Sequence, residues 1–225
     1  MPQNKSLKDK IIVALDVTSE EKAKKLINIL CGHAKIFKVG SILFTQSGPS
    51  ILRYIRKKNC GVFLDLKFFD ISNTVANAVR QAVRLKVKML TLHISGGEDM
   101  LEAAVKAAKD QSRSLGINKP LLIGVTVLTS QETSAQEVLR LAKIGLSCGL
   151  DGVVCSVREA AILRREIKKK FIIVTPGIRQ SKIAGDDQKR TATAKEALAA
   201  GSDFLVVGRP IVEATDPVKA LKEII

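Results

Sequence analysis

The chain has 225 residues, of which 37 are Lys or Arg and 22 are Asp or Glu, so its formal net charge is +15 at pH 7. Hydrophobic residues make up 46% of the sequence, enough for a sizeable core, which excludes an intrinsically disordered or low-complexity protein. No apolar run approaches the roughly 18 residues of a membrane span, which predicts that the protein has no membrane-spanning segment.

Eight short apolar segments, each a candidate strand, alternate with segments of helical periodicity. The candidate strands span residues 11–17, 35–40, 61–67, 87–94, 120–128, 152–156, 171–177 and 203–208. Between them apolar residues recur at the spacing of a helix face, as in Ala23, Leu26, Ile27 and Leu30. Strands that are apolar along their whole length need cover on both faces, as in a parallel sheet packed against helices.

Eight strand–helix units predict an α/β protein with a (β/α)8 TIM barrel fold. No linker rich in Pro, Gly or Ser divides the chain, so we expect a single domain over residues 1–225. The structural alternative is an open, doubly wound sheet, which usually has fewer strands and a Gly-rich first turn. Here Asp16-Val17-Thr18-Ser19 comes after Ile12–Leu15 in place of such a turn.

Charged residues occupy the ends of the first three candidate strands, where the active site of such a barrel lies. Asp16 ends the first, Lys38 ends the second, and Asp65 and Lys67 end the third. Side chains alternate along a strand, so Asp65 and Lys67 share a face. Because charges inside a strand are costly unless they pair with each other or with a ligand, these residues predict an acid–base cluster. A structural ion pair, with Asp70 as an ordinary helix-start carboxylate, is the alternative.

The last two candidate strands predict an anion site. Gly208 and Arg209 follow the eighth strand, where a glycine lets backbone N–H groups approach a phosphate and an arginine adds two donors. Arg179 follows the seventh strand and is itself followed by a long polar segment that ends near Arg190. A connection of this length in a small barrel is typical of a binding loop. The substrate is therefore expected to be a phosphorylated small molecule.

These features together resemble orotidine 5′-phosphate decarboxylase of the bacterial type. The matching stretches run in order along nearly the whole chain: Ala14-Leu15-Asp16, Lys38-Val39-Gly40, Asp65-Leu66-Lys67-Phe68-Phe69-Asp70-Ile71, Thr91-Leu92-His93-Ile94-Ser95-Gly96-Gly97, Gly124-Val125-Thr126-Val127-Leu128-Thr129-Ser130, Thr175-Pro176-Gly177-Ile178-Arg179, Asp187-Gln188-Lys189-Arg190 and Val206-Val207-Gly208-Arg209-Pro210-Ile211. The resemblance implies removal of CO2 from orotidine 5′-phosphate to give UMP, the last step of de novo pyrimidine biosynthesis, without a cofactor or a metal.

The resemblance also implies a role for each matched residue. The catalytic residues would be Lys67, which protonates C6, Asp65 against the substrate carboxylate, Lys38, and Asp70, lent across the interface of a homodimer. Ile71 and Thr74 would lie near that interface. Asp16 would contact the ribose and Thr129 the pyrimidine edge, while the phosphate side would be formed by Arg179, Gln188, Gly208 and Arg209.

Two rival functions remain open at this stage. A related sugar-phosphate decarboxylase, 3-keto-L-gulonate 6-phosphate decarboxylase, has a similar acid-x-Lys-x-x-Asp motif but uses Mg2+. The net charge of +15 also makes nucleic-acid binding by such a barrel an alternative function. Because the basic residues are spread along the chain and aromatic residues make up only 4%, we expect a solvated basic surface and no nucleic-acid or membrane partner.

The cysteines and histidines predict neither a disulfide framework nor a metal site. Cys31, Cys60, Cys148 and Cys155 lack CxxC spacing, which indicates reduced thiols in a cytoplasmic protein, with Cys155 the most buried. The polar N-terminus without an apolar segment agrees with a cytoplasmic location. His93 is expected to face the barrel mouth by its phase in the strand, as a positioning or a purely structural residue.

Overall fold

A closed barrel of eight parallel strands forms the centre of the computed structural model, which describes residues 7–128, 133–179 and 191–224. The strands are β1 (Ile11–Ala14), β2 (Ile36–Gly40), β3 (Gly61–Phe68), β4 (Met89–His93), β5 (Leu121–Val125), β6 (Gly152–Val154), β7 (Ile172–Thr175) and β8 (Phe204–Val207). Each strand pairs with the next, and β8 closes the ring on β1 with Ile11 opposite Leu205. The predicted TIM barrel is therefore confirmed.

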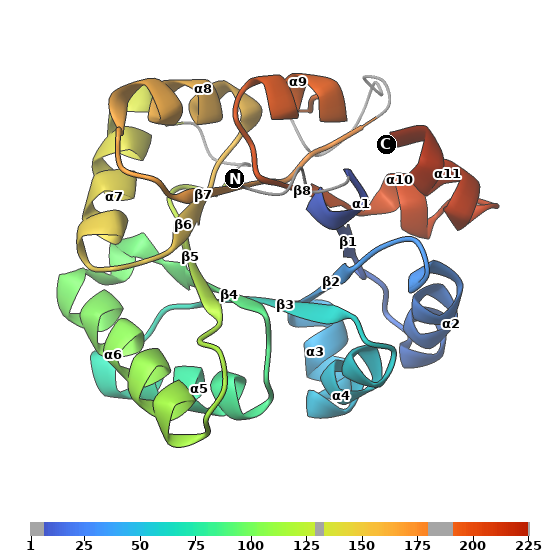
Figure 1. Ribbon diagram of the computed structural model, residues 1–225, viewed down its shortest axis with the longest axis horizontal. Coiled ribbons are helices and arrows are strands. Elements are labelled where there is room, and N and C mark those ends of the chain that lie inside the picture. The colour runs from blue at the N-terminus through green and yellow to red at the C-terminus, as the bar shows by residue number, and fades with distance from the viewer. Residues whose placement is uncertain (1–6, 129–132, 180–190, 225) are drawn as a thin grey trace.

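Helices surround the ring of strands, as Figure 1 shows. They are α1 (Leu7–Lys10), α2 (Glu20–Leu30), α3 (Ser41–Ser47), α4 (Pro49–Lys57), α5 (Ser72–Arg84), the 3-10 turn η1 (Ile94–Gly96), α6 (Glu98–Ser114), α7 (Ala135–Ser147), α8 (Val157–Glu166), α9 (Ala194–Ala199), α10 (Arg209–Val212) and α11 (Pro217–Ile224). Side-chain caps define several helix starts, such as Ser19 of α2, whose Oγ accepts a hydrogen bond from the backbone N–H of Lys22. None of the helices described is both long and apolar enough to cross a membrane.

Alternation along the strands divides the core into two layers. The larger layer lies between the barrel and its helices and includes Leu64, Val39 and the predicted α2 face. The smaller one fills the barrel interior with side chains from alternate strand positions: Ile12, Ala14, Ile36, Phe63, Met89, Ile123, Val174, Phe204 and Val206. Apolar side chains therefore fill most of the barrel interior, and polar inward-facing side chains are left to the layer nearest the carboxyl ends of the strands.

Several strands end earlier than the sequence predicts. β1 ends at Ala14, so Asp16 lies two residues beyond it, and Lys38 lies in the middle of β2 rather than at its end. Apolar residues continue past these ends because they still pack in the outer layer of the core, where Leu15 and Val17, for example, are buried. Apolar content therefore overestimates strand length at this rim.

The four cysteines are free thiols. Cys155 is the most buried, with 1% of its surface exposed, as the sequence predicts, and this burial raises the pKa of its thiol. Cys60 and Cys148 are also buried, whereas Cys31 is half-buried. They contribute to packing.

Candidate active site

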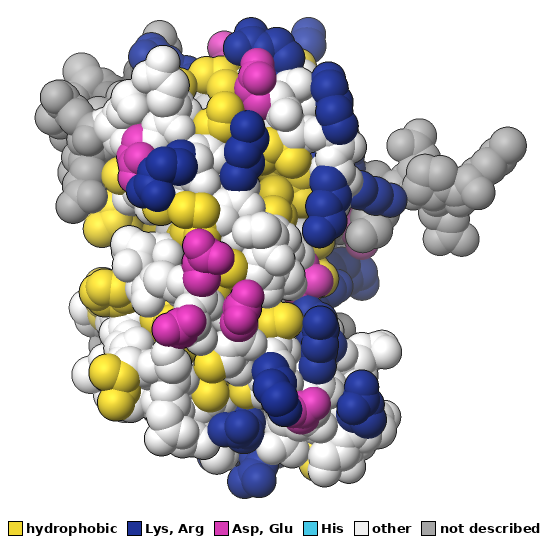
Figure 2. Space-filling view, turned by 90° about the vertical axis from the view of Figure 1, so that its left-hand side faces the viewer, with side chains coloured by type: hydrophobic (Ala, Val, Ile, Leu, Met, Phe, Trp, Pro, Cys, Tyr) yellow, Lys and Arg dark blue, Asp and Glu magenta, His cyan; other side chains and the backbone are white. Residues whose placement is uncertain are grey.

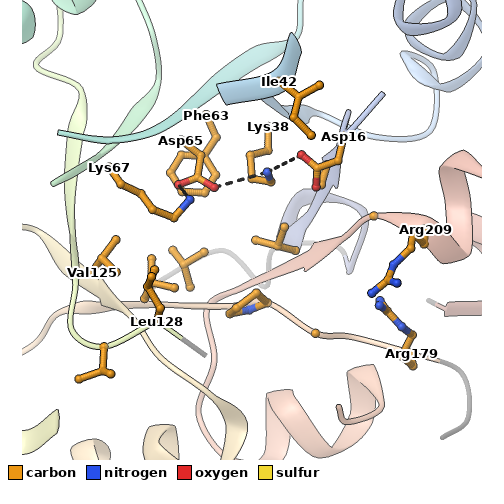
Figure 3. Close-up of a pocket in the computed structure, with 18 of the residues that line it drawn as sticks. Asp16, Lys38, Ile42, Phe63, Asp65, Lys67, Val125, Leu128, Arg179 and Arg209 are labelled. Carbon is orange, nitrogen blue, oxygen red and sulfur yellow. Dashed lines mark hydrogen bonds and ion pairs between the residues drawn. The ribbon is translucent and has the colours of Figure 1, made fainter. Parts of the chain in front are cut away.

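A cavity of about 470 Å3 opens at the carboxyl ends of the strands (Figure 3). Seven predicted site residues line it: Asp16, Lys38, Asp65, Lys67, Arg179, Gly208 and Arg209. Gly177 and Glu213, which were not predicted as site residues, line it as well. Residues from the beginning and the end of the chain meet here because the barrel closes β8 against β1. The predicted acid–base cluster and the predicted anion site therefore share one cavity.

Four of these side chains form a row of alternating charge. Lys38 Nζ lies 2.8 Å from Asp16 Oδ1 and 3.4 Å from Asp65 Oδ2, and Lys67 Nζ lies 3.0 Å from Asp65 Oδ1. The register explains this contact, since Ala14 of β1 is opposite Lys38, and Gly40 of β2 is opposite Asp65. The row thus runs Asp16, Lys38, Asp65, Lys67 across three neighbouring strands.

The middle of the row is buried and its ends are open. The exposed fractions of the side chains are 11% for Lys38 and 13% for Asp65, but 38% for Lys67 and 47% for Asp16. Burial by itself raises the pKa of Asp65, but the charges of Lys38 and Lys67 outweigh it and hold this pKa below its ordinary value. Burial likewise lowers the pKa of Lys38, and the charges of Asp65 and Asp16 raise it above its ordinary value. Both groups are therefore ionised near neutral pH.

An irregularity in β3 places Lys67 at the cavity. The pairing with β4 shifts between Leu64 and Phe68, and Lys67 adopts a left-handed backbone conformation with φ +50. A conformation of this kind costs a non-glycine residue about 1–2 kcal/mol and needs support from its surroundings. Thr91 supplies it, because its Oγ1 accepts a hydrogen bond from the Lys67 backbone N–H at 2.9 Å and donates one to Asp65 Oδ1 at 3.0 Å.

Thr91 was not predicted as a site residue. This residue is fully buried in the middle of the apolar strand β4, on the face that points into the barrel. A hydroxyl at such a position needs a hydrogen-bond partner, and that requirement was the available signal for its role. Thr91 links the backbone of one charged residue to the carboxylate of the other.

The opposite wall of the cavity carries two guanidinium groups. Arg179, after β7, and Arg209, at the start of α10, point toward each other in Figure 3, on the side away from Lys67. Gly208 lies beside them, and a Cβ at this position would be 3.7 Å from Asp16 Oδ2. Two cations directed at one region favour an anion between them.

Apolar side chains line another part of the cavity. Val125, Val154, Val174 and Val206 lie on the last four strands and contribute to this lining. Val127 and Leu128 extend this wall beyond β5. None of these residues was predicted as a site residue, although strand alternation could have placed the four valines. They give the cavity a face suited to a flat, uncharged ring.

Three predicted residues lie outside the cavity. Asp70, Ile71 and Thr74 are exposed, and Asp70 Oδ1 accepts a hydrogen bond from the Ile71 backbone N–H at 2.7 Å. Ile71 is 72% exposed and its neighbour Phe69 is 62% exposed. Two further predicted residues, Thr129 and Gln188, lie outside the described residues.

His93 ends β4, as predicted, and is half-buried. Its ring packs edge-on against Phe69, with the centroids 5.7 Å apart. Burial, and then the charge of Lys67, lowers the pKa of His93, so the ring is neutral at pH 7. Within the described ranges, no group of three or more His, Cys, Asp or Glu side chains is arranged to hold a metal ion.

The arrangement suits a reaction that develops negative charge on a phosphorylated substrate. An ammonium and a carboxylate in contact are held at one end, and the guanidinium groups of Arg179 and Arg209 lie at the other. The sequence profile described as "Orotidine 5′-phosphate decarboxylase / HUMPS family" matches residues 9–224 of the chain.

Relatives and solved structures agree with this match. Orotidine 5′-phosphate decarboxylase of Coxiella burnetii is 48% identical over 96% of this chain and 94% of its own length, and that of Moorella thermoacetica is 44% identical over 96% and 91%. The crystal structure of orotidine 5′-phosphate decarboxylase from Lactobacillus acidophilus has a TM-score of 0.83 and 35% identity, covering 96% of this chain and 97% of that one. The enzyme from Pyrococcus horikoshii OT3 has a TM-score of 0.77 and 25% identity, covering 95% and 96%.

The charged row predicts a pH-dependent loss of stability. Asp65→Asn is expected to lower the thermal unfolding midpoint at pH 7, because it removes the partner of two lysines. Since the pKa of Asp65 is lowered by folding, its stabilisation is complete above the ordinary carboxyl pKa of about 3.9 and is lost as the pH falls through the folded value. The difference between the variant and the unchanged protein should therefore shrink below about pH 4 in calorimetry.

The exposed Asp99 in the first turn of α6 offers a matched control. Asp99→Asn makes the same chemical change away from the charged row, and we expect a small effect at each pH. A destabilisation by Asp65→Asn that stays constant from pH 7 to pH 3 would contradict the role given to the Asp65 carboxylate.

Proposed function

This chain belongs to the orotidine 5′-phosphate decarboxylase / HUMPS family, and we propose that it converts orotidine 5′-phosphate to UMP with Lys67 as the proton donor. The observation that carries the proposal is the contact of 3.0 Å between Lys67 Nζ and Asp65 Oδ1 in a cavity that also contains Arg179 and Arg209. Relatives at 44–48% identity that bear this name support the substrate.

The chemistry requires a cation at the carbon that loses CO2. When the bond between C6 and the carboxylate carbon breaks, its electron pair stays on C6, and this carbanion is too unstable to form readily in water. An ammonium held beside C6 stabilises the developing charge and then transfers a proton to it. Lys67 is suited to both tasks because its side chain is partly shielded at 38% exposure and is oriented by Asp65.

Asp65 and Lys38 hold that ammonium in place. The Asp65 carboxylate is ionised and contacts Nζ of both lysines, so it cannot move toward one without leaving the other. In the proposed complex the substrate carboxylate lies against Asp65, and its departure as CO2 removes a like-charge contact. Asp16, at the outer end of the row, is placed to contact the ribose hydroxyls.

Arg179 and Arg209 would bind the phosphate at the far end of the nucleotide. Binding energy gained there can order the reacting end without touching the bond that breaks. Val125, Val154, Val174 and Val206 would support the pyrimidine ring, between Lys67 at one end of the cavity and the arginines at the other. The cavity volume of about 470 Å3 is within the usual range for small-ligand sites.

We further propose that the active unit is a homodimer to which each subunit lends Asp70. Asp70 is outside the cavity of its own chain, and it lies between two exposed apolar residues, Phe69 and Ile71. Exposed apolar side chains grouped beside a functional residue favour a surface that is covered by another subunit. Thr74 is exposed in the first turn of α5, directly after this segment, and we include it in the proposed interface.

The central test is turnover by a lysine variant. Lys67→Ala should remain folded, because the side chain is partly exposed, and should lose decarboxylation by a factor of about 10^4 or more, since it removes both the cation and the proton. The measurement is the decrease in orotidine 5′-phosphate absorbance with purified protein in the presence of a chelator. Activity that survives chelation in the unchanged protein excludes the Mg2+-dependent sugar-phosphate reaction, whereas near-normal turnover by Lys67→Ala would refute the assignment.

The anion site is tested by binding of the product. Arg209→Ala should weaken the affinity for UMP by about 10- to 100-fold, because a charge-assisted hydrogen bond to phosphate contributes roughly 1.5–3 kcal/mol. Uridine, which lacks the phosphate, provides the control and should bind both proteins equally. Unchanged UMP affinity would mean that the phosphate lies elsewhere.

The shared site predicts complementation between two inactive variants. Lys67→Ala and Asp70→Ala should each be inactive alone, but a mixed dimer has one site with both residues intact. Random reassociation of equal amounts should restore about one quarter of the unchanged activity. No recovery after subunit exchange, verified by mass measurement of mixed dimers, would place Asp70 in the same subunit as Lys67.

A further inference from the structure

The end of the barrel opposite the active site is rich in lysine. The seven connections that lead from a helix into a strand, residues 31–35, 58–60, 85–88, 115–120, 148–151, 167–171 and 200–203, are all described and contain eight lysines and two aspartates, with no arginine or glutamate. We call the eight lysines the basic rim: Lys35, Lys58, Lys86, Lys88, Lys119, Lys168, Lys169 and Lys170. Because the strands are parallel, these connections all lie at one end of the barrel.

The two aspartates of these connections have structural partners. Asp151 Oδ2 lies 2.5 Å from Lys119 Nζ and accepts a hydrogen bond from the Leu122 backbone N–H. Asp203 Oδ2 lies 2.5 Å from Arg164 and accepts one from the Ile173 backbone N–H. Among the described residues, Lys119 is the one rim lysine with a carboxylate partner. The positive charge of the rim is therefore not neutralised internally.

Backbone hydrogen bonds fix part of the rim. The Gly61 N–H donates to Lys35 O at 2.8 Å, the Lys88 N–H donates to Val62 O at 2.8 Å, and the Leu121 N–H donates to Lys88 O at 3.0 Å. Lys35 and Lys88 are thus held on either side of Gly61. A Cβ on that glycine would lie 2.7 Å from Cδ of Lys88, so the absence of a side chain makes room for the lysine stem.

A second cavity lies within the rim. It has a volume of about 410 Å3, and its polar lining consists of Lys86, Lys88, Asn118 and Lys119. No carboxylate lines it. Figure 2, which shows the side of the molecule formed by α6 and α7, has Lys and Arg side chains gathered along its right-hand edge. The rim therefore combines a concave, cationic pocket with flanking cations.

We propose that the basic rim binds the sugar–phosphate backbone of RNA. Lysine ammonium groups neutralise phosphates without identifying bases, and this binding needs clustered charge rather than aromatic side chains. A protein partner fits less well, because lysine is depleted and aromatic residues are enriched at such interfaces. A membrane surface also fits less well, since Leu115 is the one exposed large apolar residue found in these seven connections.

Four rim lysines can be compared with four lysines elsewhere at equal net charge. The rim variant combines Lys35→Gln, Lys86→Gln, Lys88→Gln and Lys170→Gln. The control combines Lys22→Gln, Lys25→Gln, Lys109→Gln and Lys219→Gln, which are exposed on helices α2, α6 and α11. None of the eight lies in the cavity proposed for catalysis, so both variants should decarboxylate orotidine 5′-phosphate at the unchanged rate.

Binding is measured by fluorescence anisotropy with a labelled oligouridine of about 20 nucleotides at about 50 mM salt. The unchanged protein should bind, the rim variant should bind at least about tenfold more weakly, and its slope of log affinity against log salt should be shallower by about 2–3. The control should stay within about threefold of the unchanged protein. Excess UMP should not displace the RNA.

Four outcomes would overturn the proposal. Absence of binding at low salt would contradict the proposal directly. Equal weakening in both variants would mean that binding depends on the net charge of the protein and not on the rim. Displacement by UMP would assign the RNA to the active-site cations. Rim-dependent binding to phosphatidylserine vesicles or to a polyglutamate peptide without binding to RNA would identify a different partner. If the unchanged protein binds RNA but does not decarboxylate orotidine 5′-phosphate, that result would count against the proposed function alone.

Discussion

The Asp65 carboxylate contacts Nζ of both Lys38 and Lys67, and the candidate site depends on this shared contact. Asp65 and Lys38 are almost fully buried, and a buried charge is tolerated only when other charges and hydrogen bonds compensate it. Asp65 is compensated by two ammonium groups and the Thr91 hydroxyl. The register of β2 against β3 brings Lys38 to Asp65, and the shifted register of β3 against β4, with the hydrogen bond from the Lys67 backbone N–H to Thr91, places the ammonium of Lys67 beside the same carboxylate.

The same alternation of side chains gives the cavity three chemically different parts. Inward positions near the mouth carry charges on β2 and β3 but valines on β5 to β8, while the arginines come from the segments that follow β7 and β8. A nucleotide also has three parts: a ring with a reacting carboxylate, a sugar and a phosphate. In the proposed complex, this correspondence lets one cavity bind the phosphate at the arginines while the reacting end lies beside Lys67.

Much of this arrangement follows from sequence patterns, because a barrel of parallel strands places residues that follow each strand at one rim. The eight strands and the location of Asp16, Asp65 and Arg209 were predictable for that reason. The positive φ of Lys67 was not, since it depends on a register shift against β4 that no local pattern encodes. The end of β1 at Ala14 was also missed, because the buried apolar residues Leu15 and Val17 continue the pattern after the strand has ended.

The basic rim shows that closure of the barrel can gather charges that are dispersed along the sequence. Along the chain the rim lysines are separated by 23 to 49 residues from one connection to the next, and such dispersed charges predict a solvated surface. In the closed barrel each helix-to-strand connection returns to the same end, so lysines distant in sequence become neighbours. The active site lies at the other end, where the strand-to-helix connections gather. Substrate chemistry and a polyanion-binding surface can therefore coexist on one barrel without competing for the same residues.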